Sequence, residues 1–303
     1  MRRGIYSIGT NSTRALVADV EAGNGKIVEQ FSIGTRLGEG LKERGHLNED
    51  AMARTVEALR EHRRHVEPLT EDVVAIATSA VRRADNTQAF ANAVRQTTGA
   101  TLRVIEGEEE ARCSFTGAVA VAPRESGVTT YGVLDPGGGS TEYATGTRGN
   151  PQRTVSCEIG AVRLSEALPE LLGKDAPVPA EKINEARGRA REALRVVGDF
   201  EKVDRLVFVG GTATTSISIL RGRREDVDVA QLTVRDVENI IARLASLPVE
   251  DRKAIAGMNP QRADILLAGA LILAAALELT QHQDALVAGG DLLLGYLLRH
   301  RNV

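Results

Sequence analysis

The sequence has only two cysteines, Cys113 and Cys157, among its 303 residues. Two cysteines cannot form a disulfide framework or a cysteine-rich zinc site. The five histidines are scattered and match no H-x-x-x-H or His-Asp metal-binding signature. The formal net charge of −3 gives no general attraction for nucleic acid or for an anionic membrane. We therefore expect no nucleic-acid partner and no zinc-dependent or disulfide-stabilised fold.

The sequence also lacks an apolar run long enough to cross a membrane. Its longest such run, residues 265–277, is rich in alanine and lies between Asp264 and Glu278. It is shorter than the ~20 residues that a transmembrane helix requires, so it predicts a buried helix. The N-terminus leads directly into a strand pattern, without the apolar region of a signal peptide. These features predict no membrane partner and a cytoplasmic location.

Neither common nucleotide-binding loop is present, because no G-x-x-x-x-G-K-[ST] motif and no G-x-G-x-x-G motif leading into a helix occurs. Instead, residues 135–142 (DPGGGSTE) follow an apolar strand and combine three glycines with two hydroxyls and an acid at each end. Glycines let backbone N–H groups approach an anion, and Asp135 and Glu142 can hold a hard cation beside it. A plain glycine turn between strands is the alternative explanation.

Two further turns resemble this one. Residues 9–13 (GTNST) lie between the strand patterns of residues 4–8 and 15–20, and residues 210–215 (GGTATT) follow the strand pattern of residues 205–209. The first two turns read as strand–turn–strand, which predicts hairpins rather than P-loops. Three turns of one style suggest two similar halves that face a shared anion.

The predicted element order supports this duplication, and the length favours two domains. In the first half we expect a β-β-β-α-β-α-β order, with strands over residues 4–8, 15–20, 26–33, 73–77 and 102–105 and helices over 48–66 and 87–97. After a helix over 108–120, we expect the same order, with strands over 130–135, 141–145, 153–158, 205–209 and 285–287. This α/β plan leaves a ligand cleft between the two domains.

Seven motifs resemble the Ppx/GppA phosphatases, a family of exopolyphosphatases and guanosine pentaphosphatases in the actin, hexokinase and Hsp70 superfamily. In family order they are residues 8–12 (IGTNS), 36–40 (RLGEG), 77–86 (ATSAVRRADN), 105–112 (IEGEEEAR), 135–142, 158–164 (EIGAVRL) and 262–264 (RAD). The resemblance implies duplicated ribonuclease H-like (actin-like ATPase) domains over residues 1–122 and 123–303, with the active site in the interdomain cleft. It also implies a short two-domain form without an HD-type domain. We expect the terminal helix to pack back on the first domain and, by analogy only, a homodimer.

The resemblance also implies roles for individual residues. Glu110 would be the general base, Arg82 would face the phosphates, and Asp135 and Glu142 would hold Mg²⁺. The implied phosphate-binding residues are Gly9, Thr10, Asn11, Ser12, Gly137, Gly138, Gly139, Ser140, Gly210, Gly211 and Thr212. Without the resemblance, Glu110 would be read as part of a solvated helix face and Arg82 as part of a surface salt bridge.

The sequence departs from the family pattern at two places. Ser7 stands where the first turn normally opens with an acid, so a carboxylate that helps to bind Mg²⁺ is missing. Residues 289–295 (GGDLLLG) replace the usual Gly-Leu-Arg-Glu-Gly. We expect weaker metal binding, a shifted substrate preference or lost activity.

The resemblance predicts a hydrolase that releases terminal orthophosphate from inorganic polyphosphate by metal-assisted attack of water. Polyphosphate is favoured because a short two-domain form offers an open cleft and no guanine pocket is identifiable in the sequence. One alternative is a pppGpp 5′-phosphohydrolase. Another is a catalytically impaired phosphate or nucleotide sensor, because of Ser7. A kinase that uses ATP at residues 210–212 is disfavoured, since residues 78–86 and 110–112 match the phosphatase branch.

Overall fold

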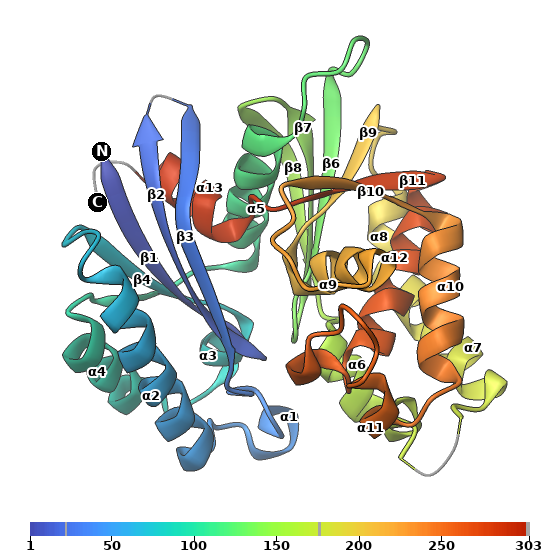
Figure 1. Ribbon diagram of the computed structural model, residues 1–303, viewed down its shortest axis with the longest axis horizontal. Helices are drawn as coiled ribbons and strands as arrows, with labels where there is room; N and C mark the ends of the chain where they lie inside the picture. The colour runs from blue at the N-terminus through green and yellow to red at the C-terminus, as the bar shows by residue number, and fades with distance from the viewer. Residues whose placement is uncertain (22, 175–176, 301–303) are drawn as a thin grey trace.

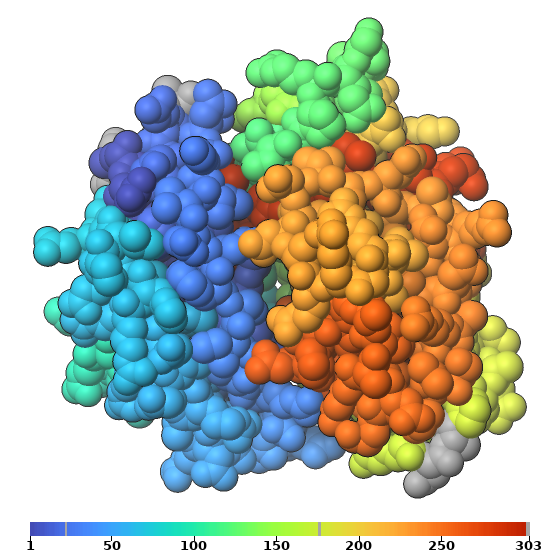
Figure 2. Space-filling model, in the orientation of Figure 1, coloured from blue at the N-terminus to red at the C-terminus, as the bar shows by residue number. Residues whose placement is uncertain are grey.

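Two mixed β-sheets, one in each half of the chain, organise the fold in the computed structural model, which describes residues 1–21, 23–174 and 177–300. Each sheet is the centre of one lobe, and the lobes stand side by side (Figure 1). The surface is hollowed along the line where the lobes meet (Figure 2). This line contains the segments that the sequence motifs single out.

The first sheet has the strand order β3-β2-β1-β4-β5. The first three strands form an antiparallel meander, and the last two run parallel to β1. The strands are β1 (Arg2–Ile8), β2 (Ser12–Glu21), β3 (Asn24–Gly34), β4 (Val73–Ala77) and β5 (Leu102–Val104). The helices of this lobe are α1 (Leu41–Arg44), α2 (Glu49–Val66), α3 (Ser79–Arg83) and α4 (Thr87–Thr98).

The second sheet repeats the same plan, with the order β10-β11-β9-β6-β7-β8. Its meander and parallel strands are β6 (Thr130–Pro136), β7 (Thr141–Thr147), β8 (Asn150–Cys157), β9 (Arg205–Phe208) and β11 (Asp284–Ala288). The edge strand β10 (Val229–Thr233) pairs antiparallel with β11 and was not predicted. Apart from β10, the strand order matches that of the first sheet. The duplicated α/β plan expected from the sequence is confirmed.

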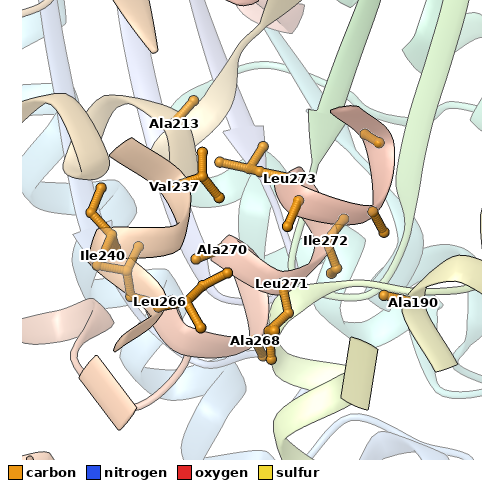
Figure 3. Packing of buried hydrophobic residues seen from close by; sticks show 14 of the residues in the cluster. Ala190, Ala213, Val237, Ile240, Leu266, Ala268, Ala270, Leu271, Ile272 and Leu273 are labelled. Atoms are coloured by element: carbon orange, nitrogen blue, oxygen red, sulfur yellow. The ribbon is translucent and has the colours of Figure 1, made fainter. Parts of the chain in front are cut away.

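The second lobe carries most of the helices. They are α6 (Ala161–Ala167), η1 (Pro169–Leu172), α7 (Ala180–Ala193), α8 (Arg195–Gly198), α9 (Gly210–Arg221), α10 (Val234–Ala245), α11 (Val249–Arg252), η2 (Pro260–Arg262) and α12 (Leu266–Thr280). As expected, the alanine-rich apolar run becomes a buried helix: every side chain of α12 from Leu266 to Leu277 is buried, and the helix packs against α7 and α10 (Figure 3). Over the described residues, no helix is long and apolar enough to cross a membrane.

Two helices lie between the sheets. Helix α5 (Gly107–Val121) packs on the meander of the second sheet, and α13 (Leu292–Arg299) packs on β1 and β2 of the first sheet (Figure 1). The two helices also pack against each other, and glycines stand at their contact. The end of the chain therefore lies against the N-terminal lobe, so α5 and α13 connect the two halves.

Strand alternation decides what faces α13. Tyr6 and Ile8 of β1 pack on the side of α2 and α4, whereas Ile5 packs with the leucines of α13. Because successive strand side chains point to opposite faces, Ser7 shares the face of Ile5. Position 7 therefore lies on the side of the sheet that faces α13 and the second lobe.

Candidate active site

Two tight turns of the same geometry face each other between the lobes. The amide of Gly9 donates to the Ser12 carbonyl at 3.0 Å, and the amide of Gly137 donates to the Ser140 carbonyl at 2.9 Å. Both turns join antiparallel strands, as the sequence predicts. A Cβ atom at Gly139 would lie 2.9 Å from Oγ1 of Thr10, so only glycine allows this approach. The turns therefore form one concave surface.

The backbone of these turns is arranged to accept an anion. The carbonyl oxygens of Asn11 and Gly138 each accept two backbone hydrogen bonds of 2.8–3.1 Å from their own lobe. Over the described residues, no acceptor is found for the amides of Thr10, Asn11, Gly138 and Gly139. Adjacent N–H groups without protein acceptors form the kind of nest that binds phosphate oxygens.

The third glycine turn has a different structure from the one expected. Gly210 has a positive φ of 81° and begins helix α9, so this is a strand-to-helix turn and the prediction of three turns of one style is wrong. Residues 210–215 are rich in threonine, which resembles a strand pattern as much as a helix pattern. The turn still borders the site, because a Cβ at Gly210 would lie 2.6 Å from Oδ1 of Asp135. The first amides of α9 have no intrahelical acceptor, as at any helix start.

Three acids of the site come from α5, β6 and β7. Glu110 is 7% exposed and Glu142 is 1% exposed, and Asp135 lies opposite Glu142 in the strand register. Burial, together with the charges of Glu142 and Asp135, raises the pKa of Glu110 well above its ordinary value. Burial and Asp135 raise the pKa of Glu142 to about 8. Desolvation raises the pKa of Asp135 to about 6. Without a ligand, Glu142 therefore holds a proton near neutral pH.

Serines that the sequence analysis missed hold two of these acids. The Ser114 hydroxyl donates to Oδ2 of Asp135 at 2.7 Å, and the Ser156 hydroxyl donates to Oε1 of Glu142 at 2.7 Å. Ser114 lies four residues after Glu110 on α5, so helical spacing could have placed both on one face. Nothing in the sequence around Ser156 singled it out.

Arginines provide the positive charge. Nη1 of Arg82 lies 3.6 Å from Oε2 of Glu110. Arg14 and Arg262, to which we assigned no role, also lie at the site: both line the cavity between the turns. Burial lowers the pKa of Arg262 to about 10. Arg14 directly follows the first turn, and Arg262 belongs to the RAD motif. Both residues therefore lie in or next to motifs that the sequence analysis identified.

The cavity between the turns has a volume of about 90 Å³. It is lined by most of the predicted residues, including both hairpin turns, the Gly210 turn, Glu110 and Asp135. Glu142 and Arg82 do not line it, but the charges of both act on Glu110. A larger cavity of about 490 Å³ adjoins it and shares Arg14, Gly210, Gly211 and Arg262. Phe31, Thr214, Thr215, Ser218 and Asn259 are among its lining residues.

The predicted Mg²⁺ ligands can be tested for fit. Over the described residues, no three His, Cys, Asp or Glu side chains converge as a ready-made metal site. Mg²⁺ is often held by one or two carboxylates, with phosphate oxygens and water as the other ligands. Asp135 suits this mode because it lines the smaller cavity. Glu142 does not line that cavity, but it is the cross-strand neighbour of Asp135, and among the described residues its buried Oε2 has no hydrogen-bond partner. The Mg²⁺ site remains a prediction.

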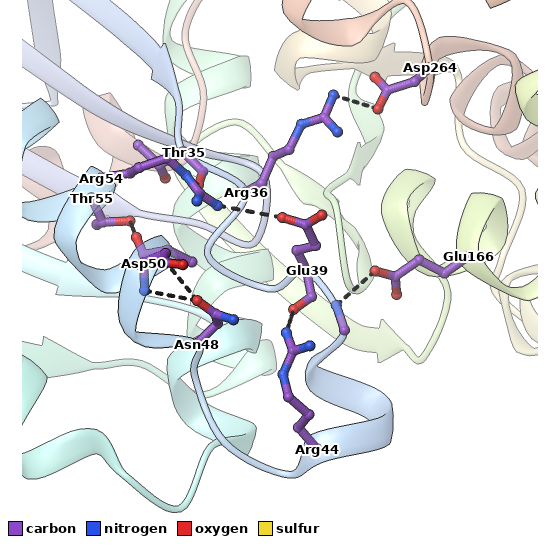
Figure 4. A network of polar contacts seen from close by, with 12 residues as sticks. Thr35, Arg36, Glu39, Arg44, Asn48, Asp50, Arg54, Thr55, Glu166 and Asp264 are labelled. Carbon is purple, nitrogen blue, oxygen red and sulfur yellow. Dashed lines mark hydrogen bonds and ion pairs between the residues drawn. The ribbon is translucent and has the colours of Figure 1, made fainter.

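Contacts across the mouth of the cleft hold the lobes together (Figure 4). Arg36 forms an ion pair of 2.6 Å with Asp264, and the Gly40 amide donates to Oε1 of Glu166 at 3.1 Å. Arg36 has a positive φ of 53°, which is uncommon for a residue with a side chain. The family-like segment of residues 36–40 thus bridges to the second lobe.

Comparison with known proteins places these features in a family. The profile described as the Ppx/GppA phosphatase family matches residues 16–300. Exopolyphosphatase 2 of Mycobacterium tuberculosis is 35% identical over 287 residues, which cover 88% of this chain and 86% of that protein. The solved structure of the Aquifex aeolicus PPX-GPPA enzyme has a TM-score of 0.80 and 29% identity, covering 99% of each chain.

One relative is much longer than this chain. The bifunctional 3-dehydroquinate synthase/phosphatase of Fusobacterium nucleatum is 29% identical over 310 residues. The match covers 98% of this chain but only 46% of that protein. The shared region is therefore about half of the longer relative.

Proposed function

Because the chain belongs to the Ppx/GppA phosphatase family, we propose that it hydrolyses phosphoanhydrides and releases terminal orthophosphate from inorganic polyphosphate. The observation that carries this proposal is the pair of facing glycine turns, whose amides have no protein acceptor among the described residues, beside the buried Glu110. An exopolyphosphatase among the relatives supports the choice of substrate.

The reaction follows from the positions of these groups. The terminal phosphoryl group binds in the smaller cavity, where turn amides, Arg14 and Arg262 contact its oxygens. Glu110 takes a proton from a water molecule while the water oxygen attacks phosphorus. The bridging P–O bond breaks, and the shortened polyphosphate leaves with the bonding electrons. A raised pKa makes the ionised Glu110 carboxylate a stronger base than an exposed glutamate. When bound at Asp135 and Glu142, Mg²⁺ would draw negative charge from the phosphoryl oxygens.

The larger cavity favours a second candidate substrate, pppGpp. Its volume of about 490 Å³ suits a nucleoside, and it opens directly beside the phosphate-binding turns. Hydroxyls of Thr214, Thr215 and Ser218 could bond to a ribose or base, and Phe31 offers an aromatic face. This cavity was not apparent from the sequence, where the lack of an identifiable guanine pocket favoured polyphosphate.

The test is phosphate release from long-chain polyphosphate, tripolyphosphate and pppGpp, each with and without Mg²⁺. Release from polyphosphate supports the main proposal, and selective release from pppGpp supports the second. Thr214→Phe places a bulky ring in the wall of the larger cavity, so it should impair pppGpp hydrolysis and spare polyphosphate. If no substrate releases phosphate, the hydrolase proposal is wrong. Binding without turnover, with activity gained in Ser7→Asp, would instead identify a sensor.

A further inference from the structure

The cleft contains a buried acid that is not among the predicted site residues. Asp291 is 2% exposed and caps the start of α13, where its Oδ1 accepts from the Leu293 amide at 3.1 Å. Its Oδ2 forms an ion pair with Arg14. Asp291 belongs to the segment that departs from the usual Gly-Leu-Arg-Glu-Gly.

Arg14, the ion-pair partner of Asp291, lies opposite Ser7, which is the other position that departs from the family pattern. Ser7 and Arg14 lie directly opposite each other in the pairing of β1 with β2. Side chains of opposed residues share a face, with Cβ atoms about 4.5–5.5 Å apart. An acid at position 7 would therefore be the immediate neighbour of Arg14. In this chain the carboxylate comes from α13 instead.

We propose that Asp291 supplies Arg14 with the carboxylate neighbour that Ser7 does not provide, and that it is the positioning residue for Arg14. Asp291 holds one side of the guanidinium, and the rest reaches the junction of the two cavities, since Arg14 lines both. The role in catalysis rests on the proposed function, because it requires a phosphoryl ligand for Arg14.

The position of Asp291 is fixed by backbone packing. A Cβ at Gly117 of α5 would lie 2.0 Å from the Asp291 carbonyl oxygen, and one at Gly290 would lie 2.4 Å from the Gly117 carbonyl oxygen. Leu292, the next residue, lines the smaller cavity together with Ser7. Asp291 is thus held at one place beside the site, and 26% of the Arg14 side chain remains exposed. This arrangement suits an arginine that must present its free side to a ligand.

The variant Asp291→Asn distinguishes the positioning of Arg14 from simple helix capping. Asn caps helices about as well as Asp, so Asp291→Asn keeps the bond to the Leu293 amide and removes the charge and the acceptor atom that face Arg14. The cleft then becomes more positive, so the affinity for an anion should stay the same or increase. Arg14 loses its fixed direction, so turnover should fall by about tenfold or more, because misplaced groups cost rate. A loosened helix would reduce affinity and turnover together.

The experiment compares wild type, Asp291→Asn, Ser7→Asp and the double variant. We measure kcat on polyphosphate, calorimetric binding of tripolyphosphate and thermal unfolding. We expect Asp291→Asn to lower kcat with affinity kept, and the double variant to recover kcat to within about threefold of wild type, since an acid again faces Arg14. Unchanged kcat in Asp291→Asn, joint loss of affinity and turnover, or no recovery in the double variant would overturn the proposal.

Thermal unfolding tests the pairing of Asp291 with Arg14 independently of the proposed hydrolase activity. Ser7→Asp should raise the Tm in the Asp291→Asn background, where Arg14 has lost its ion pair, and lower it in wild type, where it adds a surplus acid near Asp135. This sign change does not depend on hydrolysis, so it tests the pairing even if wild type has no activity. A Ser7→Asp effect of the same sign in both backgrounds would refute the replacement.

Two controls complete the design. Asp72→Asn removes the carboxylate that lies 2.9 Å from Arg3, at the end of β1 far from the site. This variant should keep the kcat of wild type. Adding Ser7→Asp to Asp72→Asn should not restore any Tm that Asp72→Asn loses. If Asp291→Asn does not fold, Arg14→Gln is added to it. Recovery of folding would show that the unpaired arginine was the cause, as we propose. Continued failure would mean that Asp291 serves the packing of α13, and the proposal would be wrong.

Discussion

Nη1 of Arg82 lies 3.6 Å from Oε2 of Glu110 and also donates to the Ile105 carbonyl at 2.6 Å. The arginine is thus held by backbone while it faces the acid. Its charge lowers the pKa of Glu110, but burial and the neighbouring acids Glu142 and Asp135 raise this pKa by more. The result is a carboxyl group whose pKa stays above its ordinary value while Arg82 is held against it.

Replacing Glu110 with Gln should separate chemistry from binding. Gln keeps the size of the side chain but cannot accept the proton of water, so kcat should fall by about 10²-fold or more. Tripolyphosphate affinity, measured by calorimetry, should persist. The matched control is Glu108→Gln on the same helix, where the side chain is 65% exposed and pairs with Arg112. If Glu110→Gln had the same kcat as Glu108→Gln, Glu110 would not be the general base, and the role would move to Asp135 or Glu142.

The sequence was sufficient to predict the sheets and the two hairpins, because both depend on local patterns. Strand alternation and glycine next to Thr10 or Ser140 are signals contained within a few residues. Duplication then predicted that the hairpins face each other, and the resemblance directed attention to Glu110. Asp135 follows directly from its position at the end of an apolar strand.

The remaining site residues depend on contacts that no local pattern encodes. Asp291 reaches Arg14 only because the last helix returns to the first lobe. Ser156 meets Glu142 through the register of two strands in a meander. The start of α9 at Gly210 was not predicted, because two glycines and three threonines have a low intrinsic preference for helix, which tertiary contacts override.

The raised pKa of Glu142 should make stability depend on pH. An unfolded glutamate titrates near 4.3, whereas burial and Asp135 raise the folded pKa of Glu142 to about 8. Between these values the folded state binds more protons, so the free energy of unfolding should fall as pH rises. The Tm of the ligand-free protein should therefore be lower at pH 8 than at pH 5.5.

The variant Glu142→Gln tests this cause. Its amide oxygen can still accept from Ser156, but the group does not titrate, so the decline in Tm should become shallower. Glu57→Gln, on the exposed face of α2, should leave the pH dependence of wild type unchanged. If the Tm of Glu142→Gln fell with rising pH as steeply as that of wild type, Glu142 would not be the cause of the pH dependence.

The ion pair across the cleft should have a small effect on ligand binding. Arg36 is 49% exposed in its pair with Asp264, and such pairs contribute at most about 1 kcal/mol. Asp264→Asn should thus raise KM for polyphosphate by no more than about fivefold, with a larger radius of gyration by solution X-ray scattering. Glu39→Gln removes a pair with Arg54 within one lobe (Figure 4) and should change neither quantity. A larger radius in both variants would show that the effect is not specific to the cleft.

The contact of α5 with α13 should tolerate no side chain at its glycines. A Cβ at Gly117 would lie 2.0 Å from the Asp291 carbonyl oxygen and 2.9 Å from the Gly295 amide nitrogen. These are backbone atoms of a buried helix and cannot move aside as a flexible side chain can. Gly117→Ala should therefore destabilise the protein by about 1–3 kcal/mol, as overpacking does.

The control for this prediction is Gly188→Ala in α7, where a Cβ would meet no atom within 4 Å. Alanine favours helix over glycine by about 1 kcal/mol, so this variant should be neutral or more stable. Urea unfolding of both variants gives the comparison, and turnover gives a second readout. Because Asp291 lies at the Gly117 contact, Gly117→Ala should also lower kcat under conditions where the protein remains folded. A Gly117→Ala variant as stable as wild type would show that α13 can move away from α5, and Asp291 would then not be fixed beside Arg14.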